Sequence, residues 1–115
     1  MNVGTGLTIG FSGYADPEHA SKAHEFEDAV LALLPDHGAN VLFRGCRATG
    51  QGDHLPLEMH VLWFPDERAF QSYLNDPRRS AILAQFGEVF STKHAVELTP
   101  RMKADALPKV PGNEA

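Results

Sequence analysis

The sequence predicts a single α+β domain in which strands and helices follow the order β-α-β-β-α-β. Apolar residues alternate over 7–14, as they do in a half-buried strand. A polar, glycine-rich segment at 50–54 separates two further apolar runs, as a hairpin loop does. An Asp-Pro pair precedes a helix-forming segment at Asp16 and again at Asp76. Two βα units joined by a hairpin give a four-stranded antiparallel sheet with the helices on one face, which is the ferredoxin-like arrangement.

Each element has a local signal. The expected strands cover 7–14, 40–49, 55–64 and 93–99. A first helix is expected over 17–34, with Asp16 as its N-cap, Pro35 as its end and Gly38 supplying positive φ before the next strand. Two more helices are expected after the caps Asp66 and Asp76. Their inward-facing residues are Ala69, Phe70, Tyr73 and Leu74 in one and Ile82, Phe86, Val89 and Phe90 in the other.

The remaining sequence organisation is that of one small soluble domain. Residues 1–99 are expected to fold, and 100–115, which contain three prolines, to form a loosely held C-terminal tail. A net charge of −5 argues against a nucleic-acid partner, because phosphate binding requires clustered basic residues. Cys46 is the single cysteine, so no intrachain disulfide forms. No apolar run approaches the roughly 18 residues of a membrane span, and the N-terminus lacks a signal-peptide pattern. We expect a cytoplasmic protein with no membrane partner.

The strand pattern also predicts a homodimer. Two helices can cover only one face of the sheet, so its second face is left uncovered. On the third strand the face expected to pack against the helices consists of Leu57, Met59, Val61 and Trp63. The opposite face is mixed, with Glu58 and His60 beside Leu62 and Phe64. Such a face suits a second copy of the sheet packed across a two-fold axis better than it suits water.

The segment 61–79 carries a family resemblance. In it a strand ends in Phe-Pro, a short helix places aromatic residues on the sheet, and an Asp-Pro pair follows. This pattern resembles small uncharacterised bacterial domains of the dimeric α/β-barrel superfamily that are related to antibiotic-biosynthesis-type monooxygenases. The superfamily includes cofactor-independent monooxygenases, haem-degrading enzymes and lactone isomerases. The resemblance therefore implies the fold and leaves the activity open.

Acid–base chemistry is the functional hypothesis that the residues favour. Glu58 and His60 lie two residues apart and so share one face of their strand. His60 is the candidate base, Glu58 the carboxylate that orients it, and Tyr14, on the neighbouring first strand, the group that polarises a substrate oxygen. Arg44 is the candidate anion-binding residue if the register brings it to the same face. The alternative is a fully paired polar network across the dimer interface with no catalytic role.

Aromatic side chains are the candidate walls of a substrate pocket between the helices and the sheet. They are Trp63, Tyr73, Phe26 and Phe70. Aromatic residues at helix and strand spacing are more often core than pocket, so the core alternative stays open.

Six histidines occur, but none has the spacing of a metal site. We therefore expect no metal and no cofactor. The sequence favours a protein that binds a small hydrophobic molecule, either as a cofactor-independent enzyme of monooxygenase or isomerase type acting on an aromatic or enolisable substrate, or as a non-catalytic ligand-binding or assembly module. A third hypothesis is haem handling, with His94 as the axial ligand.

Overall fold

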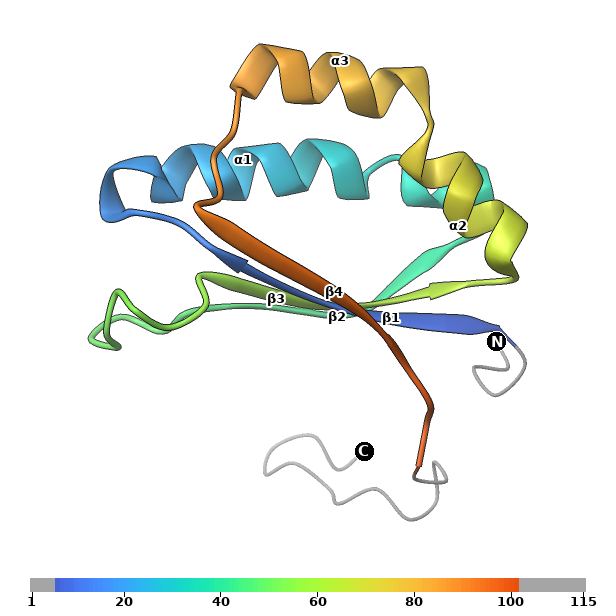
Figure 1. Cartoon of the computed structure of the whole chain (residues 1–115), viewed down its shortest axis with the longest axis horizontal. Coiled ribbons are helices and arrows are strands. Elements are labelled where there is room, and N and C mark those ends of the chain that lie inside the picture. Colours follow the sequence, from blue (N-terminus) through green and yellow to red (C-terminus); the bar gives the residue numbers. More distant parts are fainter. Residues whose placement is uncertain (1–5, 102–115) are drawn as a thin grey trace, which may run out of the picture.

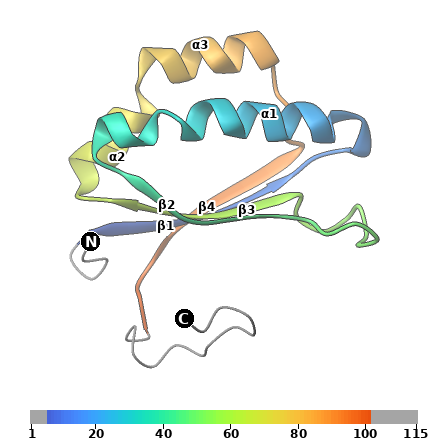
Figure 2. The ribbon, with the colours of Figure 1, turned by 180° about the vertical axis from the view of Figure 1, so that it is seen from behind.

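The computed structural model describes residues 6–101. Four strands form one antiparallel sheet in the order β2-β3-β1-β4. They are β1 (Leu7–Tyr14), β2 (Asn40–Cys46), β3 (Glu58–Phe64) and β4 (Thr92–Leu98). The α-helices are α1 (Ala20–Leu31), α2 (Glu67–Leu74) and α3 (Pro77–Phe86). All three lie on the same side of the sheet (Figures 1 and 2). The predicted ferredoxin-like α+β fold is confirmed.

Two of the predicted helix caps form as expected. The Asp66 side chain accepts a hydrogen bond from the Ala69 backbone N–H at 2.8 Å and starts α2. Asp76 accepts one from the Arg78 backbone N–H at 2.9 Å and starts α3, whose first residue is Pro77. An aspartate oxygen satisfies a backbone donor that the first helical turn leaves free, so both helix starts are local properties of the sequence.

The first predicted helix is shorter than expected and flanked by 3-10 turns, η1 (Pro17–His19) and η2 (Leu34–His37). Asp16 makes no side-chain cap; its backbone carbonyl accepts the His19 N–H instead. Pro35 lies inside η2 and does not directly end α1. Because proline has no N–H, it cannot bond to the Leu31 carbonyl, and the chain tightens before reaching it. Gly38 has the predicted positive φ, at 70°.

Several boundaries also differ from the prediction. The hairpin strands are shorter, because β2 ends at Cys46 and β3 begins at Glu58. The last helix ends at Phe86, where Gly87, with φ of 74°, turns the chain. Val89, which was expected on this helix, lies in the following loop and is buried. The predicted tail at 100–115 falls almost wholly outside the described residues.

The faces of β3 are the reverse of those predicted. Glu58, His60, Leu62 and Phe64 are buried on the helix side. Met59 is 51% exposed on the other side, and Val61 and Trp63 alternate with it. The pattern along β3 could not decide between the faces because both carry large apolar residues. The buried face is the one whose charged residues find partners on α1 and β2.

The core under the helices consists of two apolar clusters. One contains Ile9, Leu31, Leu34, Ala39, Leu62, Phe64 and Tyr73. The other contains Ala15, Ala23, Phe26, Val30, Leu57 and Val89. Three acidic or basic side chains are buried in the same layer, namely those of Glu27, Glu58 and His60. Charged groups are rarely buried without partners, so these three mark the part of the core that requires an explanation.

The second face of the sheet carries no helix among residues 6–101 and is largely apolar, with His94 and Ser12 among its polar residues. Its exposed side chains include Phe43, Met59, Val96 and Leu98, and they surround a hollow of about 260 Å³ floored by Gly10. We call this surface the open face. None of the described helices is long and apolar enough to cross a membrane.

Candidate functional site

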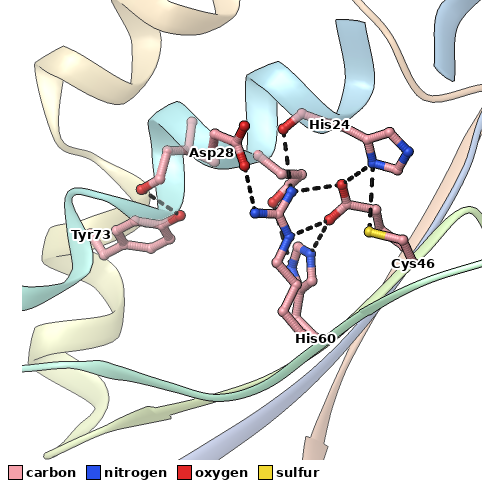
Figure 3. Close-up of polar contacts among 9 residues, drawn as sticks. His24, Asp28, Cys46, His60 and Tyr73 are labelled. Atoms are coloured by element: carbon pink, nitrogen blue, oxygen red, sulfur yellow. Dashed lines mark hydrogen bonds and ion pairs between the residues drawn. The ribbon is translucent and has the colours of Figure 1, made fainter. Parts of the chain in front are cut away.

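The candidate site is built around the carboxylate of Glu58, which is inaccessible to solvent. Arg44 donates to both of its oxygens, from Nε to Oε1 at 2.9 Å and from Nη2 to Oε2 at 2.7 Å. His60 Nε2 lies 2.6 Å from Oε1, and His24 Nδ1 lies 2.5 Å from Oε2 (Figure 3). The register of β2 and β3 explains the convergence, because Arg44 is the cross-strand partner of His60.

These contacts keep Glu58 ionised. Burial alone would raise the pKa of Glu58, but the hydrogen bonds from His60, Arg44 and His24 outweigh burial and lower that pKa to about 2. The same bond to Glu58 raises the pKa of Arg44 above its usual value, and Asp28 on α1 adds a second ion pair at 2.6 Å. The site therefore holds a fixed negative charge that is hydrogen-bonded to an imidazole.

Glu27 on α1 lies on the other side of the His60 ring. Its Oε2 is 3.5 Å from His60 Nδ1. Burial is the main cause that raises the pKa of Glu27 to about 7; attraction to His60 lowers this pKa and the charge of Glu58 raises it. The Phe11 ring stacks on His60 with its centroid 5.0 Å away and fixes the plane of the imidazole. A carboxyl group with this pKa can donate or accept a proton near neutral pH.

A cavity of about 90 Å³ lies against these two residues, between the sheet and the helices. Glu27, His60 and Arg79 are the charged or titratable groups in its wall together with Tyr73, and the rest of the lining is apolar. The Arg79 guanidinium lies 5.2 Å from the centre of the Tyr73 ring, and its Nε is buried with no hydrogen-bond partner among the described residues. A buried donor without a partner is costly, so Arg79 is suited to receive an oxygen of a bound molecule.

The structure brings together three of the predicted polar residues and separates the fourth. His60, Glu58 and Arg44 form one network. Tyr14 does not join it, because it belongs to the opposite face of β1 and lies edge-on to His94 with ring centroids 6.2 Å apart. The expectation that Tyr14 lies near His60 is wrong. It assumed that both side chains lie on the sheet face away from the helices, but the structure places His60 on the helix side of β3 while Tyr14 lies on the opposite side of β1.

The predicted aromatic wall is also only partly present. Phe70 and Tyr73 line the cavity. Phe26 is buried in the other core cluster, against Phe86 and Phe90. Trp63 of β3 is the cross-strand partner of Thr8 of β1 and alternates with the buried Leu62 and Phe64. It therefore lies on the side of the sheet opposite the helices, which contradicts the expected position between helices and sheet. His94, the candidate haem ligand, lines the hollow of the open face.

The candidate residues chosen from the sequence did not include Glu27, Arg79 or His24. A signal for Glu27 was present, because it follows Ala23 by four residues and precedes Val30 by three, which places a carboxylate within the apolar stripe of α1. Nothing local distinguishes His24 or Arg79. Their partners lie on distant segments, as the separation of 34 residues between His24 and Glu58 illustrates.

Solved structures show the same architecture. A putative antibiotic biosynthesis monooxygenase from Bacteroides thetaiotaomicron superposes with a TM-score of 0.68 at 11% identity, covering 90% of this chain and 96% of that one. A mutant of SnoaB, a cofactor-independent oxygenase from Streptomyces nogalater, gives 0.63 at 13% identity, covering 87% and 97%. A dimeric ferredoxin-like protein of unknown function from Thermobifida fusca gives 0.60 at 17% identity, covering 84% and 92%.

The chain has the same ferredoxin-like α+β fold as these structures. At these identities the likeness concerns the fold alone. The sequence matches no protein-family model and no curated protein. The function therefore has to be inferred from the residues of this chain.

The raised pKa of Glu27 predicts a pH-dependent stability. The folded pKa of about 7 exceeds the ordinary value of 4.5, so the native state binds this proton more tightly than the unfolded chain does. The resulting stabilisation is complete below about pH 4.5 and is lost as the pH rises to about 7. The difference between the two pKa values corresponds to on the order of 3 kcal/mol.

Glu27→Gln removes this dependence while keeping the side-chain shape. We expect the variant to be more stable than the original protein at about pH 8 and similar to it below about pH 4.5, as measured by urea unfolding at fixed protein concentration. Glu25→Gln, at an exposed position on the same helix, is the matched control. A stability difference between Glu27→Gln and the original protein that is the same at both pH values contradicts the assignment.

Proposed function

We propose that the protein binds a small, mainly apolar molecule with an acidic C–H or O–H group in the cavity beside His60, and transfers a proton to and from it without a cofactor. The observation that carries the proposal is the arrangement of the imidazole. The ionised Glu58 contacts Nε2, and the opposite ring nitrogen faces the carboxyl group of Glu27 at the cavity wall. This is a carboxylate–imidazole–carboxyl relay that ends in an apolar space.

The direction of proton transfer follows from the contacts. Glu58 is acceptor-only when ionised, so it favours the tautomer with hydrogen on Nε2 and leaves the lone pair on Nδ1. Nδ1 can accept a proton from the substrate, and Glu58 stabilises the imidazolium that forms. The substrate becomes an enolate or phenolate whose oxygen accepts a hydrogen bond from Arg79. Return of a proton from Glu27 or His60 to another carbon completes an isomerisation.

Oxygenation is the second outcome open to the same intermediate. An enolate or phenolate is electron-rich and can react with molecular oxygen as co-substrate, and one structural neighbour is described as a cofactor-independent oxygenase. The size of the cavity limits the substrate in both cases. About 90 Å³ holds roughly three water molecules. An aromatic ring would require the side chains of α2 and α3 at the cavity edge to move outward.

A non-catalytic ligand-binding module is the alternative that one observation favours. Both oxygens of Glu58 are already paired, and a network with no free acceptor is also what a purely structural role requires. The two functions differ in whether His60 exchanges a proton with a bound molecule.

We further propose that the protein is a homodimer that joins two open faces. An apolar sheet face of this kind is a poor surface for water and self-complementary across a two-fold axis. The description of the Thermobifida fusca neighbour as dimeric supports this arrangement. The interface differs from the one expected from the sequence, because the ionisable pair Glu58 and His60 is covered by the helices of its own chain and not by the partner.

Proton transfer can be tested with a small enolisable ketone. We expect the protein to accelerate deuterium exchange at the α-carbon of acetone, which is small enough for the cavity, in D₂O, followed by NMR. Substituting His60→Gln should reduce this acceleration by about 100-fold or more, since general bases contribute roughly 10²–10⁴-fold. The matched control is His54→Ala, in the hairpin connection and outside the cavity. If a folded His60→Gln protein accelerates the exchange as much as the original protein does, the assignment of His60 as the base is contradicted. If the original protein binds the ketone without accelerating its exchange, the ligand-binding alternative is favoured.

The dimer can be tested by light scattering at micromolar concentration. The original protein should show twice the 12.6 kDa mass of one chain. Val96→Asp, which places a charge on the open face at a side chain that is 57% exposed, should shift the protein to the monomer. Leu83→Asp, at an exposed apolar position on α3, is the control and should leave the dimer intact. A 12.6 kDa particle for the original protein excludes this interface.

A further inference from the structure

A second cluster of chemically reactive side chains lies on the outer side of Glu58, away from the cavity. His24 on α1 and Cys46 at the end of β2 meet the Glu58 carboxylate there (Figure 3). One ligand atom from each of the three residues lies within 4.8 Å of the other two. Neither His24 nor Cys46 takes part in the proton relay described above, so the cluster needs a separate explanation.

The distances in this cluster are close to those of a metal site. His24 Nδ1 lies 3.7 Å from Cys46 Sγ. Zinc bonds of about 2.0–2.1 Å to nitrogen and 2.3 Å to sulfur, at a tetrahedral angle, separate these two atoms by roughly 3.6 Å. The separation of 2.5 Å between Nδ1 and Glu58 Oε2 is that of a hydrogen bond. It would have to open by roughly 0.9 Å, which a small rotation of the partly exposed imidazole can supply.

The local charge also permits a cation. Two carboxylates, Glu58 and Asp28, face a single guanidinium, that of Arg44, and leave one negative charge uncompensated. A cysteine thiolate would add another. A divalent ion then brings the cluster to neutrality with His24 uncharged. Arg44 does not block the position, because a carboxylate oxygen has two lone pairs and Oε2 can accept from Nη2 while it binds an ion.

We propose that His24, Cys46 and Glu58 form a zinc site with its fourth position open to solvent. Nitrogen, sulfur and carboxylate oxygen together are a ligand set that zinc prefers. Both His24 and Cys46 reach the surface, which provides the path of entry and room for a water ligand. Binding forms a zinc–sulfur bond and releases the thiol proton to solvent, and the neutral His24 changes tautomer, from hydrogen on Nδ1 to hydrogen on Nε2, so that the Nδ1 lone pair binds the ion. The ion joins α1 to the β2–β3 hairpin, so it stabilises the folded chain.

This site could not be predicted from the sequence, because its ligands are 22 and 12 residues apart along the chain, without a recognisable spacing. Only the strand register makes Cys46 the direct cross-strand partner of Glu58. The proposal does not depend on the proposed function, because the zinc ligand would be Oε2 of Glu58 while His60 contacts Oε1.

Cobalt is the most direct probe, because a cobalt–thiolate bond has its own near-ultraviolet absorption band. The full chain is reduced, treated with a chelator, desalted and titrated with Co²⁺ without oxygen. We expect this band to saturate at one equivalent, together with visible bands typical of four-coordinate cobalt, and to disappear when Zn²⁺ is added. Cys46→Ser should abolish the near-ultraviolet band. His24→Ala should weaken Co²⁺ binding by at least the roughly 10-fold that even an outer-shell change causes.

His54→Ala is the matched control, since His54 is an exposed histidine of the hairpin connection, and it should bind Co²⁺ as the original protein does. Both test positions reach the surface, and circular dichroism confirms that each variant is folded. The proposal is overturned if the folded original protein shows no cobalt–thiolate band at millimolar Co²⁺. It is also overturned if the band persists in Cys46→Ser, or if His24→Ala binds Co²⁺ as tightly as the original protein.

Discussion

The ion pair between Glu58 and Arg44 is the interaction on which the rest of the structure depends. It places a fully buried carboxylate at the start of β3 and holds it with two hydrogen bonds from β2. Removing a charge from water costs several kcal/mol, and the cost is offset only when every acceptor has a partner. His24 and His60 supply the remaining partners, and Asp28 fixes the far end of Arg44. One carboxylate thus sets the positions of α1, β2 and β3.

The two oxygens of the Glu58 carboxylate contact two different groups of side chains. Towards the cavity its Oε1 orients His60, whose other nitrogen faces Glu27. Towards the surface its Oε2 meets His24, beside Cys46. The ionisable groups are covered by helices of their own chain, which leaves the open face free to be apolar. The proton transfer and the self-association that we propose therefore use opposite faces of one sheet, and a substitution on either face tests one proposal without the other.

How much was predictable depends on the range of the interaction. The order of elements and the starts of α2 and α3 followed from neighbours along the chain, such as Asp66 with Ala69. The faces of β3 did not, because Leu62 and Phe64 on one side balance Val61 and Trp63 on the other, and the choice rests on Arg44, 14 residues away from Glu58. Tyr14 and Trp63 were misplaced with that choice. Glu27 was open to prediction as a carboxylate in an apolar helical stripe.

A double-mutant cycle on Arg44 and Glu58 tests the central interaction most directly. Arg44→Met alone leaves the buried carboxylate without its main partner and should cost about 3–5 kcal/mol of unfolding free energy in urea. The double variant Arg44→Met/Glu58→Met should be destabilised by clearly less than the sum of the two single variants, with a coupling above about 1.5 kcal/mol. Additivity within about 0.5 kcal/mol would mean that the two side chains act independently, and would contradict the account.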